Sequence, residues 1–257
     1  MGLARGEDGR EYVLKVDMPE GFGDDGWMNN VSALRIAQGQ GYAKLYACDT
    51  GKRACLLERL GRPLSCLDYS VREQLRIICG VLEKSWGIPV REPALSDGSA
   101  SIAWFRGFLQ EGWSACGRPC PEEVLGQAFR YLDARERQLD CRDWVLVHGD
   151  AHSNNTLEDF SSDGGFKLVD PDGIFYEKAY DLGVLMREWP EEYEEKPLES
   201  GRRRCRYLHE LTGVEEQAIW EWGFLQTVST AFVLLQIGQM EEGQRMLETA
   251  RNWLWDA

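Results

Sequence analysis

The sequence predicts an α+β chain, with a small β-rich part at the N-terminus and a larger, mainly helical remainder. Short segments with strand-like alternation lie before residue 60. Apolar residues at helical spacing dominate after the break at Gly61-Arg62-Pro63. The chain has 257 residues, of which 43% are hydrophobic and 28% charged, so it is long enough to bury substantial cores. We therefore expect two parts, 1–60 and 61–257.

The N-terminal part is expected to contain three strands and one helix. Alternating side chains bounded by turn residues predict strands at 11–16, 42–48 and 53–60. The first strand carries Lys15, and a turn at 49–52 joins the other two as a hairpin. A loop rich in Gly, Asp and Pro is expected at 17–26. A helix follows over about 27–38, because apolar residues share one face and Gly39 ends it.

The larger part is expected to be helical except around its centre. Spacing predicts helices at 71–86 and 122–139, strands at 144–147 and 166–169, and helices from Glu177 to the end with a break near 190–201. The segment 87–121 is rich in Pro, Gly and Ser, and its secondary structure stays open. The two strands are expected to pair and to flank a loop at 148–165.

The charge of the chain excludes several classes of partner. Acidic residues number 43 and basic residues 29, which gives a formal net charge of −14. Such a surface repels phosphate backbones and anionic lipids, so we expect no nucleic acid and no membrane partner. Residues 148–257 hold 22 acidic and 10 basic side chains, so a cationic small molecule is the expected ligand. The acidic segment 188–195 is either a solvated loop or a rim that attracts an amine-bearing acceptor.

Cysteine usage and hydropathy point to a cytoplasmic protein. The eight cysteines form no CxxC pair, and no secretory signal opens the sequence, so the thiols are expected to be reduced. Residues 222–240 carry no charge, but their Gln, Thr, Ser and Gly content is too polar for a membrane span. A buried helix is expected there instead.

Chemistry-bearing side chains concentrate in two neighbouring loops. The first, His148-Gly149-Asp150-Ala151-His152-Ser153-Asn154-Asn155, follows one expected strand, and Asp170-Pro171-Asp172-Gly173 follows the other. Oxygen atoms of Asn and Asp suit Mg²⁺, and Asp150 can accept a proton from an attacking hydroxyl. Lys15 can neutralise nucleotide phosphates from the N-terminal part. These are the groups that phosphoryl transfer needs.

Five fragments in this order resemble the aminoglycoside phosphotransferases, small-molecule kinases with a protein-kinase-like fold, and most of all their streptomycin-kinase-like branch. The fragments are Leu14-Lys15-Val16, Leu56-Leu57-Glu58-Arg59, His148–Asn155, Val169–Gly173 and Ala179–Leu182. The paired loops are the specific part of the resemblance, which spans residues 11–189. It implies a bilobal fold with a small, shortened β-rich N-lobe (1–60) and a large helical C-lobe (61–257).

The resemblance also implies roles for single residues. Asp150 would be the catalytic base, Asn155 and Asp170 would hold Mg²⁺, and Lys15 would contact the nucleotide phosphates. The phosphoryl donor would be ATP or GTP. The acceptor would be a hydroxyl of an aminoglycoside-like or other cationic small molecule, which includes antibiotic resistance among the expected functions.

The resemblance also implies a hinge segment and two supporting residues. The segment from Glu58 to Leu60 would be the hinge between the lobes, whose backbone meets the purine. His148 and Asp181 would orient the catalytic loop without taking part in the chemistry. His152 is interpreted as a packing residue of the loop.

Two departures from the family pattern concern the N-terminal part. The helix at 27–38 offers Asn29 and Asn30 but no acid to pair with Lys15, unlike the helix glutamate of kinases. Only fourteen residues precede Lys15, where family members have two strands and a phosphate-covering turn. Gly6 and Gly9 can make one turn but no full hairpin. Either the start is truncated or a minimal upper lobe holds the nucleotide.

Other interpretations of the same residues stay open. A degenerate kinase fold that binds a ligand or partner without turnover would also fit the two departures. The Asp and Asn side chains can instead cap turns, and Lys15 can be a solvated strand lysine. His148, Asp150 and His152 can be ligands of a hydrolase metal centre. A protein kinase is disfavoured, because the sequence holds neither H-R-D nor A-P-E.

Overall fold

The computed structural model describes the chain except for residues 8, 18–24, 91–94 and 257. The chain folds into two compact units, one of residues 1–96 with 144–176 and one of residues 97–143 with 177–257. The boundary expected at residue 60 falls inside the first unit. The reason is that the central strands pair with the N-terminal part, through bridges from Tyr42 to Leu168 and from Pro63 to Leu157.

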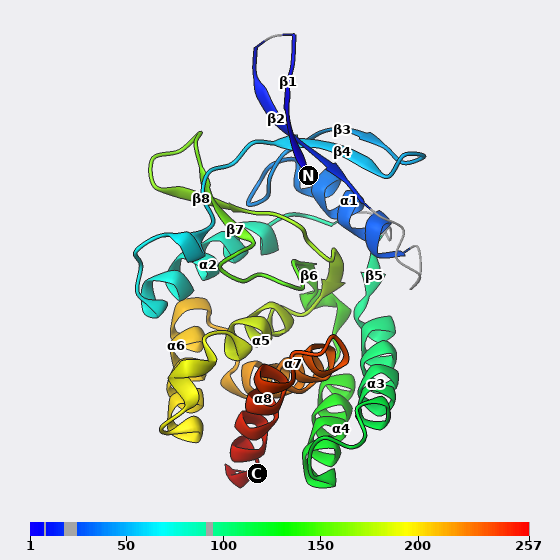
Figure 1. Ribbon diagram of the computed structural model, residues 1–257. Helices are drawn as coiled ribbons and strands as arrows, with labels where there is room; N and C mark the ends of the chain where they lie inside the picture. The colour runs from blue at the N-terminus through cyan, green and yellow to red at the C-terminus, as the bar shows by residue number, and fades with distance from the viewer. Residues whose placement is uncertain (8, 18–24, 91–94, 257) are drawn as a thin grey trace. The chain divides into compact units, whose positions relative to one another are not determined.

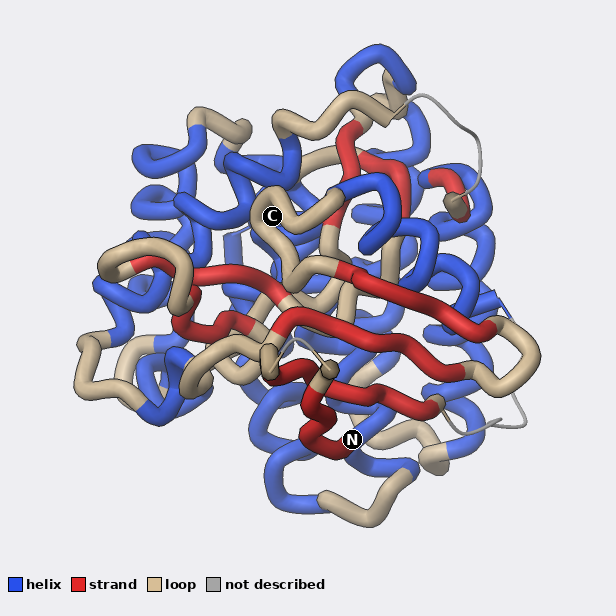
Figure 2. Tube along the Cα trace, turned by 90° about the horizontal axis from the view of Figure 1, so that it is seen from above, coloured by secondary structure: helices blue, strands red, loops and turns tan. Residues whose placement is uncertain are grey.

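A four-stranded antiparallel sheet forms the N-terminal end of the first unit (Figure 1). Its strand order is β1 (Gly2–Arg5), β2 (Glu11–Val16), β4 (Ala54–Glu58) and β3 (Leu45–Asp49). Figure 2 shows these strands side by side. The last three confirm the predicted strands, and Lys15 lies opposite Cys55 in the ladder between β2 and β4.

The residues before Lys15 form one strand and a tight turn. β1 pairs with β2 from Gly2 opposite Leu14 to Arg5 opposite Glu11, and the Gly9 N–H donates to the Gly6 carbonyl in the turn between them. One strand and one turn precede the Lys15 strand, so the expectation that no full hairpin fits before this strand is confirmed. β1 is paired because the Lys15 strand itself is the second arm of the hairpin.

Helix α1 (Asp25–Ala37) confirms the helix predicted at 27–38. Val31, Leu34 and Ala37 are all buried, which is the face that the spacing predicts. Gly39 adopts a positive φ of 87°, a left-handed conformation that ends the helix without steric strain. The loop predicted at 17–26 lies mostly outside the described residues.

Helix α2 (Val71–Trp86) confirms the long amphipathic helix and begins with a capping box. The Ser70 hydroxyl accepts from the Glu73 N–H, and the Glu73 carboxylate accepts from the Ser70 N–H. Leu75, Ile78 and Leu82 are buried along one face. A 3₁₀ turn, η1 (Leu64–Cys66), precedes the helix.

Four short strands complete the first unit and correct the predicted pairing. They are β6 (Val145–Val147), β7 (Thr156–Asp159), β8 (Gly165–Leu168) and β9 (Ile174–Tyr176). β6 and β8 confirm the two predicted strands, but they do not pair with each other. β6 pairs with β9 and β7 pairs with β8, each antiparallel. The partners were not predicted because they are only three and four residues long and adjoin loops rich in Asp, Asn and Gly.

Six helices build most of the second unit. They are α3 (Gly98–Ala115), α4 (Glu122–Arg137), α5 (Ala179–Arg187), α6 (Pro197–Thr212), α7 (Glu216–Gln236) and α8 (Met240–Asn252). Shorter elements are β5 (Ser96–Asp97) at the unit boundary, and 3₁₀ turns at Cys141–Asp143, Pro190–Tyr193 and Trp253–Asp256. The segment left open, 87–121, contains α3. Ile102, Phe105 and Leu109 of α3 have helical spacing and are buried, but the Gly and Ser residues of its first turn make the segment resemble a loop in the sequence.

Helix α7 is the core helix of the second unit. Trp222, Phe224 and Phe232 have no more than 1% of their surface exposed. By length and composition α7 could span a membrane, with a mean hydropathy of 1.2, yet 83% of that window is buried inside the fold. This confirms the expected buried helix, although the uncharged stretch continues beyond α7 to the start of α8.

All eight cysteines are free thiols, as expected. Cys55, Cys79, Cys120 and Cys205 are buried. Burial raises the pKa of Cys120 to about 11 and that of Cys205 to about 12, so both stay protonated at neutral pH. They act as small apolar side chains of the core.

One buried cation joins three helices of the second unit. Arg135 of α4 is 3% exposed and pairs with Glu221 of α7, and it lies 3.2 Å from a carboxylate oxygen of Glu177, just before α5. The Trp222 Nε1–H donates to the same Glu177 side chain at 2.7 Å. Burial raises the pKa of Glu177. Removal of the arginine would leave two carboxylates buried without their cation.

We therefore expect Arg135→Met to lower the free energy of unfolding by about 3–5 kcal/mol, the usual effect of removing one partner of a buried ion pair. Arg130→Met is the matched control, because Arg130 lies on the exposed side of the same helix and should change stability by about 0.5 kcal/mol or less. Urea denaturation measures both. Equal stability of the two variants would contradict the structural role of Arg135.

Candidate active site

A buried histidine anchors the loop between β6 and β7. His148 has 0% of its surface exposed. Its Nδ1 accepts a hydrogen bond of 3.1 Å from the Asp150 backbone N–H, so the proton is on Nε2, which donates to the Val169 carbonyl at 2.8 Å. Burial lowers the pKa of His148 to about 4, so the ring is neutral at pH 7. The imidazole thus ties Asp150 to the residue that precedes Asp170.

Glycine is required where this loop packs on the next one. Gly149 has a φ of 90°, and a Cβ atom there would lie 2.5 Å from an Asp172 carboxylate oxygen. The Asp172 N–H donates to the His148 carbonyl at 2.8 Å. The two loops therefore touch along their backbones, and any other residue at 149 would separate them.

The Asp150 carboxylate is held by two side chains of its own loop. The Asn155 Nδ2 lies 3.0 Å from the Asp150 carbonyl and 3.3 Å from its Oδ2. The His152 Nε2 lies 3.2 Å from the same Oδ2. The Asn154 N–H donates to the His152 Nδ1, so His152 presents its Nε2–H to the carboxylate.

This contact makes His152 more than the packing residue that the sequence predicts. The position of His152 two residues after Asp150, in a tight loop, is the sequence signal that could have revealed this contact. The His152 N–H also donates to the Asp150 carbonyl at 3.0 Å. Two donors on one oxygen fix the rotation of the carboxylate.

The strand lysine and the second loop meet directly. Lys15 Nζ lies 2.8 Å from Asp170 Oδ1, and the two side chains are 18% and 33% exposed. Asp170 has a φ of 57°, a left-handed conformation that is uncommon outside glycine and concentrates at functional sites. The Val169 N–H donates to the Asn155 carbonyl at 2.9 Å, which joins this loop to the first. The first unit thus brings together Lys15, Asp150, Asn155 and Asp170.

The expected hinge lies at the end of β4. The Glu58 N–H donates to the Lys44 carbonyl, and the Glu58 carboxylate pairs with Lys167 of β8 at 2.8 Å. Leu60 is 8% exposed, and the Gly61 N–H donates to the Glu158 carbonyl. The Glu58 side chain therefore joins β4 to β8.

Asp181 lies in the first turn of α5, in the second unit, and is fully buried. Its expected role in orienting the catalytic loop stays a prediction.

The donor atoms fit Mg²⁺ better than a transition metal. Among the described residues, no group of three or more His, Cys, Asp or Glu side chains is arranged to hold a metal ion. Both nitrogens of His148 are used in backbone contacts, which argues against the hydrolase centre. Mg²⁺ needs only one or two protein oxygens, since waters and substrate phosphates complete its shell. Asn155 turns its amide nitrogen to Asp150, which leaves its amide oxygen on the other side of the side chain.

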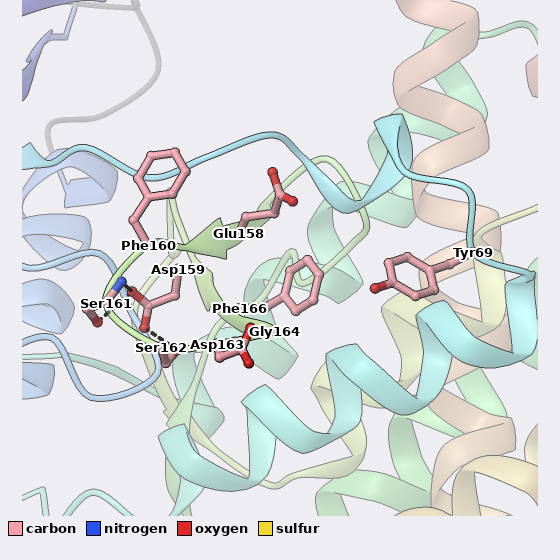
Figure 3. Close-up of a pocket in the computed structure, with 10 residues that line it drawn as sticks. Tyr69, Glu158, Asp159, Phe160, Ser161, Ser162, Asp163, Gly164 and Phe166 are labelled. Carbon is pink, nitrogen blue, oxygen red and sulfur yellow. Dashed lines mark hydrogen bonds between the residues drawn. The ribbon is translucent and has the colours of Figure 1, made fainter.

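A separate cavity of about 460 Å³ lies beside the β7–β8 hairpin (Figure 3). Tyr69 and Phe166 line it, with ring centroids 6.4 Å apart. Two of its carboxylates are engaged, Glu158 by Arg62 and Asp159 by the Ser161 and Ser162 hydroxyls. None of the expected site residues lines this cavity, so it is not the candidate active site.

The solved structures show a protein-kinase-like fold, and the family match makes the chain a small-molecule kinase. The chain belongs to the aminoglycoside/hydroxyurea antibiotic resistance kinase family, whose family model matches residues 3–238. A search of curated protein sequences finds no match. The family match confirms the resemblance that the five fragments indicate.

Solved structures show the same fold at low sequence identity. A choline kinase from Streptococcus pneumoniae has a TM-score of 0.67 and 16% identity, covering 99% of this chain and 89% of that one. An aminoglycoside phosphotransferase in a ternary complex with ADP and hygromycin B has a TM-score of 0.64 and 16% identity, covering 98% and 93%. A spectinomycin phosphotransferase bound to AMP has a TM-score of 0.56 and 14% identity, covering 94% and 87%.

The buried neutral His148 predicts a pH dependence of stability. An unfolded histidine binds a proton below about pH 6.5, whereas the folded one binds it only near pH 4. Between these values the unfolded state holds more protons, so stability falls as the pH falls, by about 3 kcal/mol across the window. Urea denaturation at pH 7, 5.5 and 4.5 measures this, and His148→Gln should show a smaller decrease. An equal decrease in both proteins would contradict a neutral His148.

Proposed function

We propose that this protein transfers the γ-phosphate of ATP or GTP to a hydroxyl of an aminoglycoside-like or other cationic small molecule. The observation that carries the proposal is the joined pair of loops, in which Asp150, Asn155 and Asp170 lie with Lys15 in one unit. Membership of the resistance-kinase family supports it. So do the structural relatives, two of which were solved with ADP and hygromycin B or with AMP.

Asp150 is the proposed base. Its Oδ2 is held by Asn155 and His152, so the carboxylate keeps one orientation when the acceptor arrives. As the acceptor oxygen bonds to the γ-phosphorus, the bond from phosphorus to the β–γ bridging oxygen breaks and Asp150 takes the hydroxyl proton. A fixed carboxylate needs no reorganisation at that moment, which is how positioning contributes to the rate.

Asn155 and Asp170 are the proposed holders of Mg²⁺. A Mg²⁺ ion held there would neutralise charge on the transferred phosphoryl group. Lys15 lies 2.8 Å from Asp170 Oδ1, so its ammonium group is in place to contact the nucleotide phosphates beside the metal ligand. The hinge backbone from Glu58 to Leu60 is the proposed contact for the purine.

The acceptor is proposed to carry amines. Residues 148–257 hold 22 acidic and 10 basic side chains, and such a field raises the local concentration of cations. The relatives named above include a choline kinase and a phosphotransferase solved with hygromycin B. An amine-bearing antibiotic is therefore the proposed substrate class.

The decisive experiment measures nucleoside diphosphate release with ATP and GTP across aminoglycosides, amino sugars and choline-like compounds. With any acceptor that is turned over, Asp150→Asn should lower kcat by about 10²–10⁴-fold, because the amide cannot take the proton. Nucleotide affinity should stay unchanged. Asp163→Asn, the same substitution in the exposed turn after β7, is the matched control. A wild-type kcat in Asp150→Asn would remove Asp150 from the mechanism.

A second experiment tests whether the site binds a nucleotide together with Mg²⁺, as the proposed reaction requires. Wild-type protein should gain thermal stability with Mg·ATP or Mg·GTP, equivalent to about 2.7 kcal/mol when the ligand is at 100 times its Kd. Asp170→Asn should lose the magnesium-dependent part of this gain, because one negative charge of the site is gone. Thermal shift with and without EDTA measures both. A full magnesium-dependent gain in Asp170→Asn would contradict the assignment of Asp170.

A further inference from the structure

The partner of Lys15 differs from the usual kinase arrangement. In protein kinases the strand lysine pairs with a glutamate of the neighbouring helix. Here α1 carries no acidic residue after Asp25, its first residue, and Lys15 pairs instead with Asp170. The ion pair of Lys15 therefore does not connect α1 to the active-site loops, and a different contact makes that connection.

The side chain of Asn30 supplies that connection. Asn30 is 8% exposed, and its Nδ2 donates to the Pro171 carbonyl at 2.9 Å. Pro171 follows Asp170 directly, so the bond reaches the backbone next to the proposed metal ligand. An amide–carbonyl bond buried in this way leaves an unpaired acceptor if the donor is removed.

A second contact between α1 and the same turn lies two residues further on. Gly173 has a φ of 69°, and a Cβ atom there would lie only 2.4 Å from the Asn29 carbonyl oxygen and 3.0 Å from the Ala33 Cβ. The helix and the turn therefore meet backbone to backbone. Together with Asn30, this contact holds the turn 170–173 against one face of α1, while Lys15 holds Asp170 from β2.

We propose that Asn30 is a positioning residue that couples α1 to the Asp170 turn and so takes the structural place of the helix carboxylate of kinases. The inference rests on the proposed function, since it assigns Asn30 an effect on the site through Asp170. A neutral amide suits this place, because it adds no second negative charge beside Asp170. The positive charge of Lys15 is then directed to Asp170 and the nucleotide alone.

The test uses Asn30→Asp, which keeps the size of the side chain but replaces the donor by an acceptor. We expect kcat to fall about tenfold, which corresponds to roughly 1.4 kcal/mol of lost stabilisation. The Mg²⁺ concentration for half-maximal rate should rise, while KM for the acceptor should stay the same. Asn30→Leu, which has neither donor nor charge, should act in the same direction. Asn252→Asp, the same change at an exposed hydrogen bond within α8, is the control and should keep the wild-type Mg²⁺ dependence.

A readout without turnover keeps the two proposals distinguishable. Hydrogen exchange followed by mass spectrometry should show faster exchange in Asn30→Asp both in α1 and in the segment 169–176, with α2 unchanged. If the wild type turns over no acceptor but this paired change is seen, the proposed function fails and the coupling stands. Wild-type kcat and Mg²⁺ dependence in Asn30→Asp, or changed exchange in α1 alone, would overturn the inference. Loss of folding in both Asn30 variants would also overturn it, because it would assign Asn30 to the stability of the whole unit.

Discussion

The hydrogen bonds of one buried imidazole hold the candidate site together. His148 contacts the Asp150 N–H with one nitrogen and the Val169 carbonyl with the other, so two loops that are separated in sequence share a single fixed point. Only a neutral ring can accept on one side and donate on the other. Burial keeps the imidazole neutral. The backbone contacts of Gly149 and Asp172 depend on the same short distance between the two loops.

The site was more predictable from the sequence than the strands that carry it. The loops 148–155 and 170–173 combine rare residue types at close spacing, and only a few chemistries require that combination. The predicted pairing of β6 with β8 was wrong, since β6 pairs with β9 and β8 pairs with β7. Three- and four-residue strands have too few side chains to show an alternation, so their pairing is decided by contacts remote in sequence. Helix α3 escaped prediction for a related reason, because its Gly- and Ser-rich first turn resembles a loop.

The remaining surprises are side-chain contacts between distant residues. The absence of a helix acid was visible in the sequence, but the direct pairing of Lys15 with Asp170 and the bond from Asn30 to Pro171 were not. Both join residues more than a hundred positions apart. Sequence spacing predicts which face of an element a residue occupies, and the fold alone decides which distant group meets it. The contact of His152 with Asp150 is local, and it shows that a residue assigned to packing can also orient a carboxylate.

The discontinuity of both units has a consequence for biosynthesis. The first unit needs residues 144–176 to complete it, and the second unit needs 177–257. A nascent chain emerges from the ribosome N-terminus first. β1 to β4 are therefore synthesised long before β7 and β8, whose residues Leu157 and Leu168 form bridges with Pro63 and Tyr42. Lys15 then waits for Asp170 through the synthesis of four intervening α-helices, α1 to α4. Premature termination before residue 144 would therefore release a product that lacks the loop 148–155 and the segments that complete both units.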